Sequence, residues 1–370
     1  MLKLLLAFEL AFFVLTCKGE SPEEFPTCDC DFGVCRCVPY YLCNNDSIVT
    51  DGGGLLDLRT LPSRPAVDPE ENSKRGACGL WSVCCTAPSE KPVIKPEEKY
   101  QHLCGKRNKD GLSTRILNQH LREDEAQFGE YPWQCALLRE EGKLNVFACG
   151  ASLIGDNVVA TAAHCVRDIQ PGILKIRCGE YDTQSTEESY PHVDFRVKDV
   201  VLHPDFNKNN AYNDLALLFL TEKVKFVQNV DTICLPEEGE EFSGTRCVVT
   251  GWGKNAFDRT GEYQRLLRSV VLPVVPHGEC EKHLKKTRLG SFFKLFEGFM
   301  CAGGEEGVDA CKGDGGGPLA CESGGGYKLA GVVAWGIGCG QKDVPGVYVK
   351  VSKYVPWIYE QAKHHGSVLA

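Results

Sequence analysis

Three features are missing from this sequence, and two of the absences exclude a class of partner. There is no block of basic residues, and the formal net charge at pH 7 is −9. Nucleic acid is therefore not expected as a partner, because its recognition depends on many Lys and Arg contacts to phosphates. After the first residues, no apolar run is long enough for a membrane helix, so no membrane partner is expected. No internal repeat is present either.

What is present is the composition of an ordinary globular protein, with 43% hydrophobic and 25% charged residues over 370 positions. That length is sufficient for two domains. The chain starts with Lys3 and an apolar run of about 13 residues, which is too short to cross a bilayer and is typical of a secretory signal peptide. The alternative, a buried N-terminal helix, is disfavoured by the polar segment Glu20–Glu24 that follows. Residues 1–19 are predicted to be a signal peptide, and the protein is expected to be extracellular.

Cysteine is abundant, with 21 residues, of which Cys17 falls within the predicted signal. The even number that remains in a secreted chain predicts a framework of disulfides. Zinc at Cys28 and Cys30 with Cys35 and Cys37 is disfavoured, because zinc ligands usually have two to four residues between them and no pair of histidines lies nearby.

The cysteines form two groups that predict two modules. Eight lie between Cys28 and Cys85 and twelve between Cys104 and Cys339. The first module, residues 27–86, is too small to bury much apolar surface and must be held by disulfides. It contains the glycosylation sequon Asn45-Asp46-Ser47. Residues 87–103, rich in Pro, Lys and Glu, are typical of an exposed linker.

The second module, residues 104–365, alternates short β-branched runs with Gly, Asp and Asn turns. Such runs at this spacing predict an all-β barrel or sandwich; they include Val158–Ala160, Ala216–Leu220, Cys247–Thr250 and Gly331–Ala334. Val355–His364 has helical spacing and predicts a terminal helix.

Four motifs occur in a fixed order along this module. They are Thr161-Ala162-Ala163-His164-Cys165, Asn213-Asp214-Leu215-Ala216-Leu217-Leu218, Gly251-Trp252-Gly253 and Cys311-Lys312-Gly313-Asp314-Gly315-Gly316-Gly317-Pro318-Leu319. Together they resemble the trypsin-like serine protease family over residues 128–360. The resemblance implies a mainly β fold with two six-stranded barrels and a C-terminal helix.

Serine protease chemistry needs a serine nucleophile, an imidazole base and a carboxylate that orients the base. The resemblance makes His164 the base and Asp214 the orienting carboxylate, and it places Gly315 in the nucleophile position. Glycine has no side chain, and no Ser, Thr or Cys nearby is free to replace it. Loss of the nucleophile alone costs about 10⁶ in turnover in such enzymes, so the chain is predicted to be inactive.

His164 and Asp214 then have two interpretations. In the first, they bind a ligand in the cleft that holds the substrate in active proteases. In the second, they persist as a buried hydrogen-bonded pair. The second is favoured because an unpaired buried carboxylate is costly. The resemblance also implies a specificity pocket with Asp309 as its acid and Gly336 and Gly346 in its walls. That pocket either captures a basic side chain or is an ancestral remnant, and the sequence leaves both open.

The resemblance further implies disulfides and a metal loop. Its family pairs are Cys149–Cys165, Cys247–Cys321, Cys280–Cys301 and Cys311–Cys339, to which Cys104–Cys234 and Cys135–Cys178 are added. The segment after Cys178 resembles the family's calcium loop, with Glu180, Asp182 and Glu187 as oxygen ligands for Ca²⁺. Tyr190 stands where a further family acid is usual, and a solvated acidic loop is the alternative.

A segment between Cys280 and Cys301 is longer than the family usually has. Its apolar positions have roughly helical spacing, and one side is basic. Either it is a partner-binding ridge, or it is a surface helix that packs its aromatics inward, which is favoured. The apolar residues are Leu284, Leu289, Phe292, Phe293 and Phe296, and the basic ones are Lys282, Lys285, Lys286 and Arg288.

The first module resembles an arthropod clip domain. The residues that carry this likeness are Cys35–Cys43, Leu56-Asp57-Leu58-Arg59 and Cys78 with Val83-Cys84-Cys85. The resemblance implies the pairs Cys37–Cys78 and Cys43–Cys85, and leaves the partners of Cys28, Cys30, Cys35 and Cys84 open.

A clip module, the joint Cys104-Gly105-Lys106-Arg107-Asn108 and the glycine at 315 together resemble the clip-domain serine protease homologues. That family implies a cofactor in haemolymph that assists a clip-domain activating protease in converting prophenoloxidase to phenoloxidase, and that self-associates after cleavage. Cleavage is expected after Arg75, with Arg115 as the second choice. The competing hypothesis is a pattern-recognition or peptide receptor that uses the Asp309 pocket.

Overall fold

The computed structural model divides the chain into two compact units, Met1–Val93 and Ile94–Ala370. It describes five short strands between residues 27 and 86. In the second unit it describes residues 100–112, 124–142, 144–185, 188, 190–253, 263–307, 314–338 and 340–370.

The first unit contains a five-stranded sheet in the order β1-β2-β5-β4-β3. Strands β2 and β5 are antiparallel, with Cys37 opposite Cys84. Cys85 is buried and disulfide-bonded, but the side chain of Cys43 and all of Cys78 lie outside the described part, so the two clip pairings stay predictions. The strands are β1 (Thr27–Cys28), β2 (Cys35–Pro39), β3 (Cys43–Asn44), β4 (Ser47–Ile48) and β5 (Ser82–Thr86).

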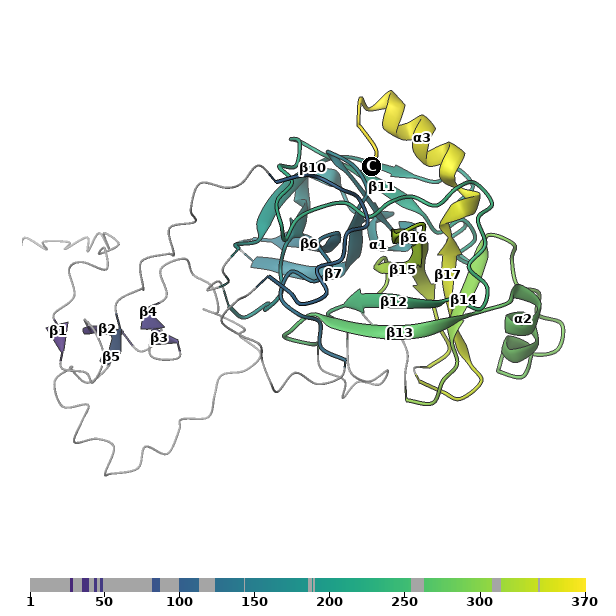
Figure 1. Ribbon diagram of the computed structural model, residues 1–370, viewed down its shortest axis with the longest axis horizontal. Coiled ribbons are helices and arrows are strands. Elements are labelled where there is room, and N and C mark those ends of the chain that lie inside the picture. The colour runs from purple at the N-terminus through teal and green to yellow at the C-terminus, as the bar shows by residue number, and fades with distance from the viewer. Residues whose placement is uncertain are drawn as a thin grey trace, which may run out of the picture. The chain divides into compact units, whose positions relative to one another are not determined.

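The second unit begins with a closed barrel of six antiparallel strands in the order β10-β11-β8-β7-β6-β9 (Figure 1). Side chains alternate along β9, where Leu174, Ile176 and Cys178 are buried, as expected when one face of a strand looks into a barrel. The strands are β6 (Gln134–Glu141), β7 (Leu144–Leu153), β8 (Val158–Thr161), β9 (Leu174–Cys178), β10 (Val193–Leu202) and β11 (Ala216–Leu220).

A second closed barrel follows, in the order β12-β13-β14-β17-β16-β15. The two barrels confirm the mainly β, trypsin-like double-barrel fold that the motifs predict. The strands are β12 (Arg246–Gly251), β13 (Arg268–Val275), β14 (Phe299–Gly303), β15 (Pro318–Ser323), β16 (Gly326–Trp335) and β17 (Pro345–Lys350).

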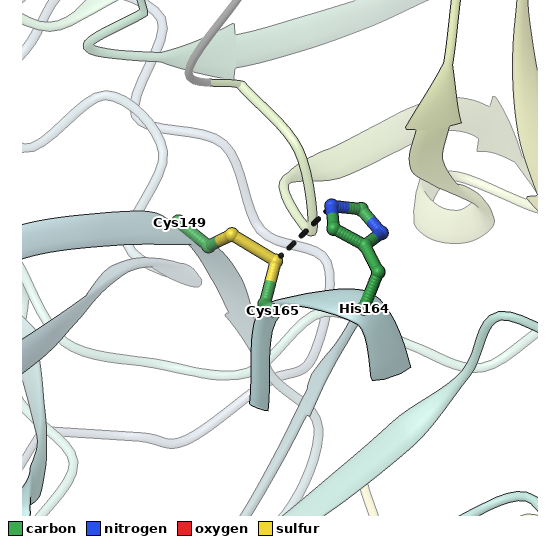
Figure 2. A group of neighbouring side chains, drawn as sticks. All are labelled: Cys149, His164 and Cys165. Carbon is green, nitrogen blue, oxygen red and sulfur yellow. Dashed lines mark hydrogen bonds between the residues drawn. A yellow bond between two sulfur atoms is a disulfide. The ribbon is translucent and has the colours of Figure 1, made fainter. Parts of the chain in front are cut away.

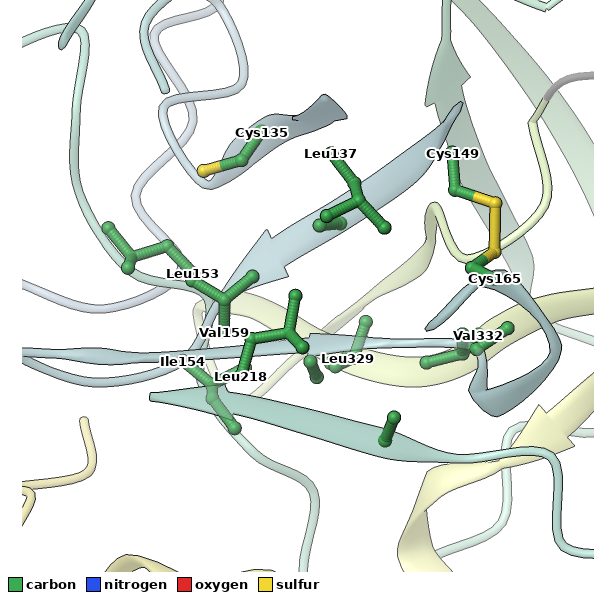
Figure 3. Close-up of a cluster of buried hydrophobic side chains, with 14 of the residues drawn as sticks. Cys135, Leu137, Cys149, Leu153, Ile154, Val159, Cys165, Leu218, Leu329 and Val332 are labelled. Carbon is green, nitrogen blue, oxygen red and sulfur yellow. A yellow bond between two sulfur atoms is a disulfide. The ribbon is translucent and has the colours of Figure 1, made fainter. Parts of the chain in front are cut away.

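One large core joins side chains from both barrels. Leu153, Val159 and Leu218 of the first barrel belong to the same buried cluster as Leu329 and Val332 of the second (Figure 3). Each of these five side chains is fully buried. Burying such side chains is worth about 1.5–3 kcal/mol each, so apolar packing holds the two barrels against one another and fixes the loops between them.

Helices are few among the described residues. They are α1 (Ala163–Val166), α2 (His277–Lys285), α3 (Val355–His364) and the short 3₁₀ helices Pro171–Ile173 and Val351–Lys353. Helix α3 has the bounds that the sequence predicts, and it buries Val355, Ile358 and Ala362. Among the described residues, no helix combines the length and apolar character that crossing a membrane requires.

Five disulfides are described in the second unit, and they are pairs that the sequence proposes. They are Cys104–Cys234, Cys135–Cys178, Cys149–Cys165, Cys247–Cys321 and Cys280–Cys301. Bridges of this kind are worth roughly 2–4 kcal/mol each. Cys311 and Cys339 lie outside the described residues, so their pairing stays a prediction.

Candidate functional site

His164 lies on the single-turn helix α1, directly after β8 of the first barrel. Its backbone is fixed because the two residues before it, Ala162 and Ala163, are fully buried. The imidazole itself is 37% exposed. The fold thus presents one ring edge of His164 toward solvent while the other edge faces the protein.

Asp214 holds the inner edge of that ring. It lies just before β11 and is fully buried. Its Oδ1 accepts the backbone N–H of His164 at 2.7 Å, and its Oδ2 lies 2.6 Å from His164 Nδ1. The neighbouring Asn213 adopts a left-handed φ of 53° and accepts a hydrogen bond from the hydroxyl of Tyr354 at 2.9 Å. The two contacts between Asp214 and His164 favour a proton on Nδ1 of His164. The Nε2 lone pair is then directed away from Asp214.

Gly315 faces His164 Nε2. A Cβ built on Gly315 would lie 3.2 Å from Nε2, 3.5 Å from Cε1 and 4.0 Å from Cys149 Sγ. The structure therefore brings together His164, Asp214 and Gly315, the three residues that the sequence singles out. Two of the groups that serine protease chemistry uses are in place, and the residue opposite them carries no hydroxyl.

The backbone at Gly315 has little room to move. Its carbonyl accepts the N–H of Gly150 at 2.9 Å, and a Cβ on Gly150 would come within 2.7 Å of the Cα of Gly317. Gly316 has a left-handed φ of 79°, and a Cβ there would lie 2.6 Å from the Gly150 carbonyl oxygen. The chain is packed directly against β7, so the position of Gly315 relative to His164 is set by contacts that only glycine permits.

Asp314, next to Gly315, points the other way. Its Oδ1 accepts the N–H of Gly253 at 2.9 Å, and a Cβ on Gly251 or Gly253 would clash with its carboxylate. The Gly-Trp-Gly motif is thereby explained, since both glycines make room for this carboxylate while Trp252 is buried in the core.

Whether a metal ion could bind beside His164 can be judged from the potential ligand atoms near it. Potential ligand atoms of Cys149, His164 and Cys165 lie within 4.8 Å of one another. Both sulfurs are already joined in a disulfide, and Cys165 Sγ lies 3.5 Å from His164 Nε2 (Figure 2). Because a metal binds the thiolate form of cysteine, this trio does not fit a metal ion while the disulfide is intact.

The walls of the predicted specificity pocket lie side by side. Gly336 directly follows β16, and Gly346 lies near the start of β17, where Trp335 pairs with Val347. Among the described residues, a Cβ on Gly336 would meet only the Gly338 carbonyl oxygen, at 3.5 Å. Asp309, the predicted acid of the pocket, lies outside the described residues.

The predicted calcium ligands already have cationic partners. Asp182 is buried, and its two oxygens accept hydrogen bonds from Arg265 at 2.7 and 2.6 Å. Glu180 is also buried, and its Oε2 lies 3.2 Å from Arg177 and 3.1 Å from Nδ1 of His192. Calcium needs six to eight oxygen ligands that are free to bind it, so this donor set fits Ca²⁺ poorly. The third predicted ligand, Glu187, lies outside the described residues.

Glu188 is not among the calcium ligands that the sequence predicts. Its Oε1 accepts the N–H of Asp182 at 2.8 Å, whereas its Oε2 is buried and has no hydrogen-bond partner among the described residues. Burial raises the pKa of Glu188 to about 8, and the neighbouring carboxylates of Glu180 and Asp182 act in the same direction. The loop therefore carries one carboxyl group that is protonated at neutral pH.

A further network anchors the start of the second unit, and the sequence gives no sign of it. The Tyr100 hydroxyl donates to Asp231 Oδ2 at 2.6 Å, and His102 Nδ1 lies 2.5 Å from Asp231 Oδ1 while its ring stacks on Phe226. Asp231 is fully buried. Tyr100 and His102, which the sequence assigns to the linker, thus pack onto the connection between β11 and β12. Their partners lie about 130 positions away, so no local spacing could have shown the contact.

Three predicted modification sites lie outside the described residues. They are the glycosylation site Asn45 and the cleavage sites after Arg75 and Arg115, and each stays a prediction.

Comparison with known families agrees with this geometry. The family model described as Trypsin matches residues 121–358, and the one described as Serine protease Clip domain PPAF-2 matches residues 26–86. The two matches cover the double barrel and the small disulfide-rich module.

Individual proteins align with most of this chain. Phenoloxidase-activating factor 2 of Galleria mellonella is 44% identical over 295 residues, which cover 75% of this chain and 96% of that protein. Inactive CLIP domain-containing serine protease A28 of Anopheles gambiae is 38% identical over 373 residues, covering 96% of this chain and 95% of that protein. Inactive CLIP domain-containing serine protease A3 of Aedes aegypti is 38% identical over 334 residues, covering 88% and 66%.

Proposed function

This chain belongs to the trypsin family and carries a clip domain, as do the insect proteins named inactive clip-domain serine proteases, and from that premise we propose that it is a secreted, non-catalytic cofactor in prophenoloxidase activation. The observation that supports the proposal is Gly315. It occupies the place where a nucleophile would meet His164 Nε2, and it has no side chain with which to attack a carbonyl.

The family relationship supplies the pathway. The relative named phenoloxidase-activating factor 2 shares 44% of aligned residues. By this likeness, the protein acts in haemolymph after removal of residues 1–19, and its partners are prophenoloxidase or phenoloxidase and a clip-domain activating protease. Cleavage after Arg75, or after Arg115 as the second choice, switches it on and permits self-association.

A protein without a nucleophile contributes through binding. The His164–Asp214 pair is intact, and among the described residues little packs against Gly336. The competing function, a receptor that captures basic side chains at Asp309, depends on a residue outside the described part, and no described contact favours it.

The test reconstitutes the reaction from purified components. Prophenoloxidase and its activating protease are mixed with or without the full chain, and phenoloxidase activity is measured. A parallel arm incubates the chain alone with an arginine-amide substrate to look for hydrolysis. We expect phenoloxidase activity to require the chain and the amide to stay intact. Equal phenoloxidase activity without the chain would remove the cofactor role.

Two variants refine the result. Arg75→Gln and Arg115→Gln each block one predicted cleavage site while the rest of the chain is unchanged. We expect Arg75→Gln to abolish stimulation and Arg115→Gln to preserve it. The opposite pattern would move the activating cut to the second site without affecting the cofactor proposal.

A further inference from the structure

A basic segment that starts within α2 has a feature that the cofactor role leaves unexplained. Residues 282–294 contain five cationic side chains and no Asp or Glu, although the whole chain has a net charge of −9. Helix α2 lies at the outer edge of the second barrel, at the right of Figure 1, and the segment comprises its last four residues and the turns that follow. We call residues 282–294 the basic ridge.

Most apolar side chains of this region pack inward, but the predicted surface helix is wrong for the aromatic residues, because α2 ends at Lys285 and the phenylalanines lie in the turns that follow. Leu284 is fully buried, Phe296 stacks on Tyr212 with ring centroids 4.2 Å apart, and Phe293 meets Trp335 edge-on at 6.3 Å. These contacts account for Phe293 and Phe296 without any partner.

Phe292 is the exception. Its side chain is 97% exposed, whereas the next most exposed large apolar residue among those described, Val368, is at 62%. A single exposed apolar residue is ordinary on a protein surface. What distinguishes Phe292 is the extent of its exposure, since the neighbouring Phe293 packs against Trp335 while the Phe292 ring is almost completely exposed.

The backbone that presents Phe292 is well anchored. Gly290 has a left-handed φ of 79°, and its carbonyl accepts the N–H of Phe293 at 3.1 Å. Glu281 on α2 accepts the N–H of Leu295 at 3.0 Å, and the disulfide Cys280–Cys301 closes both ends of the segment. The ring is therefore held outward by a fixed turn, and little ordering entropy would be lost if a partner covered it.

Most cations of the basic ridge have no ion-pair partner among the described residues. Lys282, Lys286, Arg288 and Lys294 are all exposed, and none forms an ion pair with any described residue. Only Lys285 is paired, with Glu281 on its own helix. Lys282 and Lys286 are four positions apart and so point to the same side. Four exposed charges without an ion-pair partner among the described residues, in the same short segment as one exposed ring, leave the ridge complementary to a negative surface.

We infer that the basic ridge is a docking surface for an acidic protein partner, with Phe292 inserted into an apolar pocket and the four cations at the rim. Protein interfaces commonly have this arrangement, with one aromatic anchor in the centre and charges that steer association at the edge. A lipid surface is disfavoured, since a single exposed ring gives only weak and reversible membrane attachment.

This inference rests on the proposed function, because its probes are the two proteins of that reaction. The full chain, after treatment with the activating protease, is titrated in separate arms against purified prophenoloxidase and against an active-site-blocked form of the protease. The variants are Phe292→Ser and the double variant Lys286→Glu/Arg288→Glu. Matched controls are Tyr359→Ser, another exposed aromatic residue, and Lys198→Glu/Lys208→Glu, two exposed lysines elsewhere on the first barrel.

We expect both ridge variants to weaken binding to one probe about tenfold or more, and both controls to leave it within about twofold. The charge variant should lose its effect as salt rises, because rim charges are screened, while Phe292→Ser should keep it. Phenoloxidase stimulation should then require correspondingly more of each ridge variant.

Other outcomes separate the two proposals. If the wild-type chain binds a probe and both ridge variants bind it equally well, the ridge is not the docking surface and the cofactor role stands. If the wild-type chain binds neither probe and does not stimulate, both proposals fail. A further arm uses vesicles of phosphatidylserine and phosphatidylcholine, and ridge-dependent binding to these alone would replace the protein partner with a membrane.

Discussion

Asp214 holds His164 by two hydrogen bonds, one to the backbone N–H at 2.7 Å and one to Nδ1 at 2.6 Å, although the residue that faces the other ring nitrogen is Gly315. The orienting half of a catalytic apparatus is thus intact where the reacting half is missing. Because Asp214 is fully buried, its carboxylate needs these donors whether or not any reaction occurs.

The dyad is therefore expected to stabilise the fold. In His164→Ala the buried carboxylate of Asp214 loses the donor to Oδ2, which should cost about 2 kcal/mol of unfolding free energy. Urea denaturation followed by circular dichroism measures this, with the exposed His277→Ala as the matched control. If His164→Ala costs no more than the control, the pair does not stabilise the fold, and ligand binding becomes the better explanation for its presence.

Restoring a serine is not expected to restore hydrolysis. A Cβ at Gly315 would lie 3.2 Å from His164 Nε2, which is too close for a hydroxyl beyond it to reach a good hydrogen bond unless the imidazole shifts. Gly315→Ser should therefore leave arginine-amide cleavage at background, and Gly315→Ala reports whether a Cβ alone disturbs folding. Cleavage by Gly315→Ser that disappears in Gly315→Ser/His164→Ala would show instead that only the hydroxyl was missing.

Because of Glu188, the free energy of unfolding should fall as the pH rises from about 4.5 to about 8. Its pKa is raised from 4.5 to about 8 in the folded protein, so the folded state binds this proton more tightly than the unfolded state. The stabilising contribution is then complete below about pH 4.5 and is lost as the pH rises through about 8.

Glu188→Gln keeps the neutral form at every pH, so its melting temperature relative to wild type should rise between pH 5 and pH 9. The measurement is a thermal melt at each pH with a chelator present, and the exposed Glu238→Gln is the control. A constant difference across this range would contradict the raised pKa.

Calcium is expected to have little effect on the wild-type chain, because Arg265 occupies both oxygens of Asp182. A ligand that binds only the folded state raises the melting temperature. Millimolar Ca²⁺ should therefore leave the wild-type melt unchanged and should raise that of Arg265→Gln, in which the carboxylate is released. A clear calcium-dependent rise in the wild-type protein would return the loop to the ligand set Glu180, Asp182 and Glu187.

The stability of the second unit should depend on Arg107, which lies in the segment that follows Cys104. Its guanidinium donates to the buried carboxylate of Glu130 and to the hydroxyl of Tyr327 at 3.2 Å. Arg107→Ala leaves Glu130 buried with fewer donors and should cost about 3 kcal/mol, whereas Lys106→Ala, at an exposed neighbour, should cost almost nothing. Urea unfolding of both variants with the Cys104–Cys234 bridge intact makes the comparison.

Short sequence motifs are sufficient to predict most of the fold. The segments around His164, Asp214 and Gly315 were sufficient to predict two barrels, because the family resemblance links each motif to a known place in one architecture. The short β-branched runs Val158–Ala160 and Ala216–Leu220 lie within β8 and β11. Local propensity and order along the chain were enough for these features.

Contacts between distant positions could not be predicted in the same way. Nothing in the sequence joins Asp182 to Arg265, which lies 83 positions later, so the sequence alone does not predict this ion pair, and calcium binding at the loop stays a prediction. The partner of a charged side chain depends on which segments the fold brings together, and charge alone does not specify it.

The sequence by itself determined the family, the double barrel and the absence of a hydroxyl at position 315, because each is a property of residue identity and order. Only the tertiary structure decided which aromatic residues of the basic segment are buried. Phe293 and Phe296 have Trp335 and Tyr212 beside them, while Phe292 has none. Adjacent residues with the same side chain differ in burial because packing is set by what the rest of the chain places next to each of them.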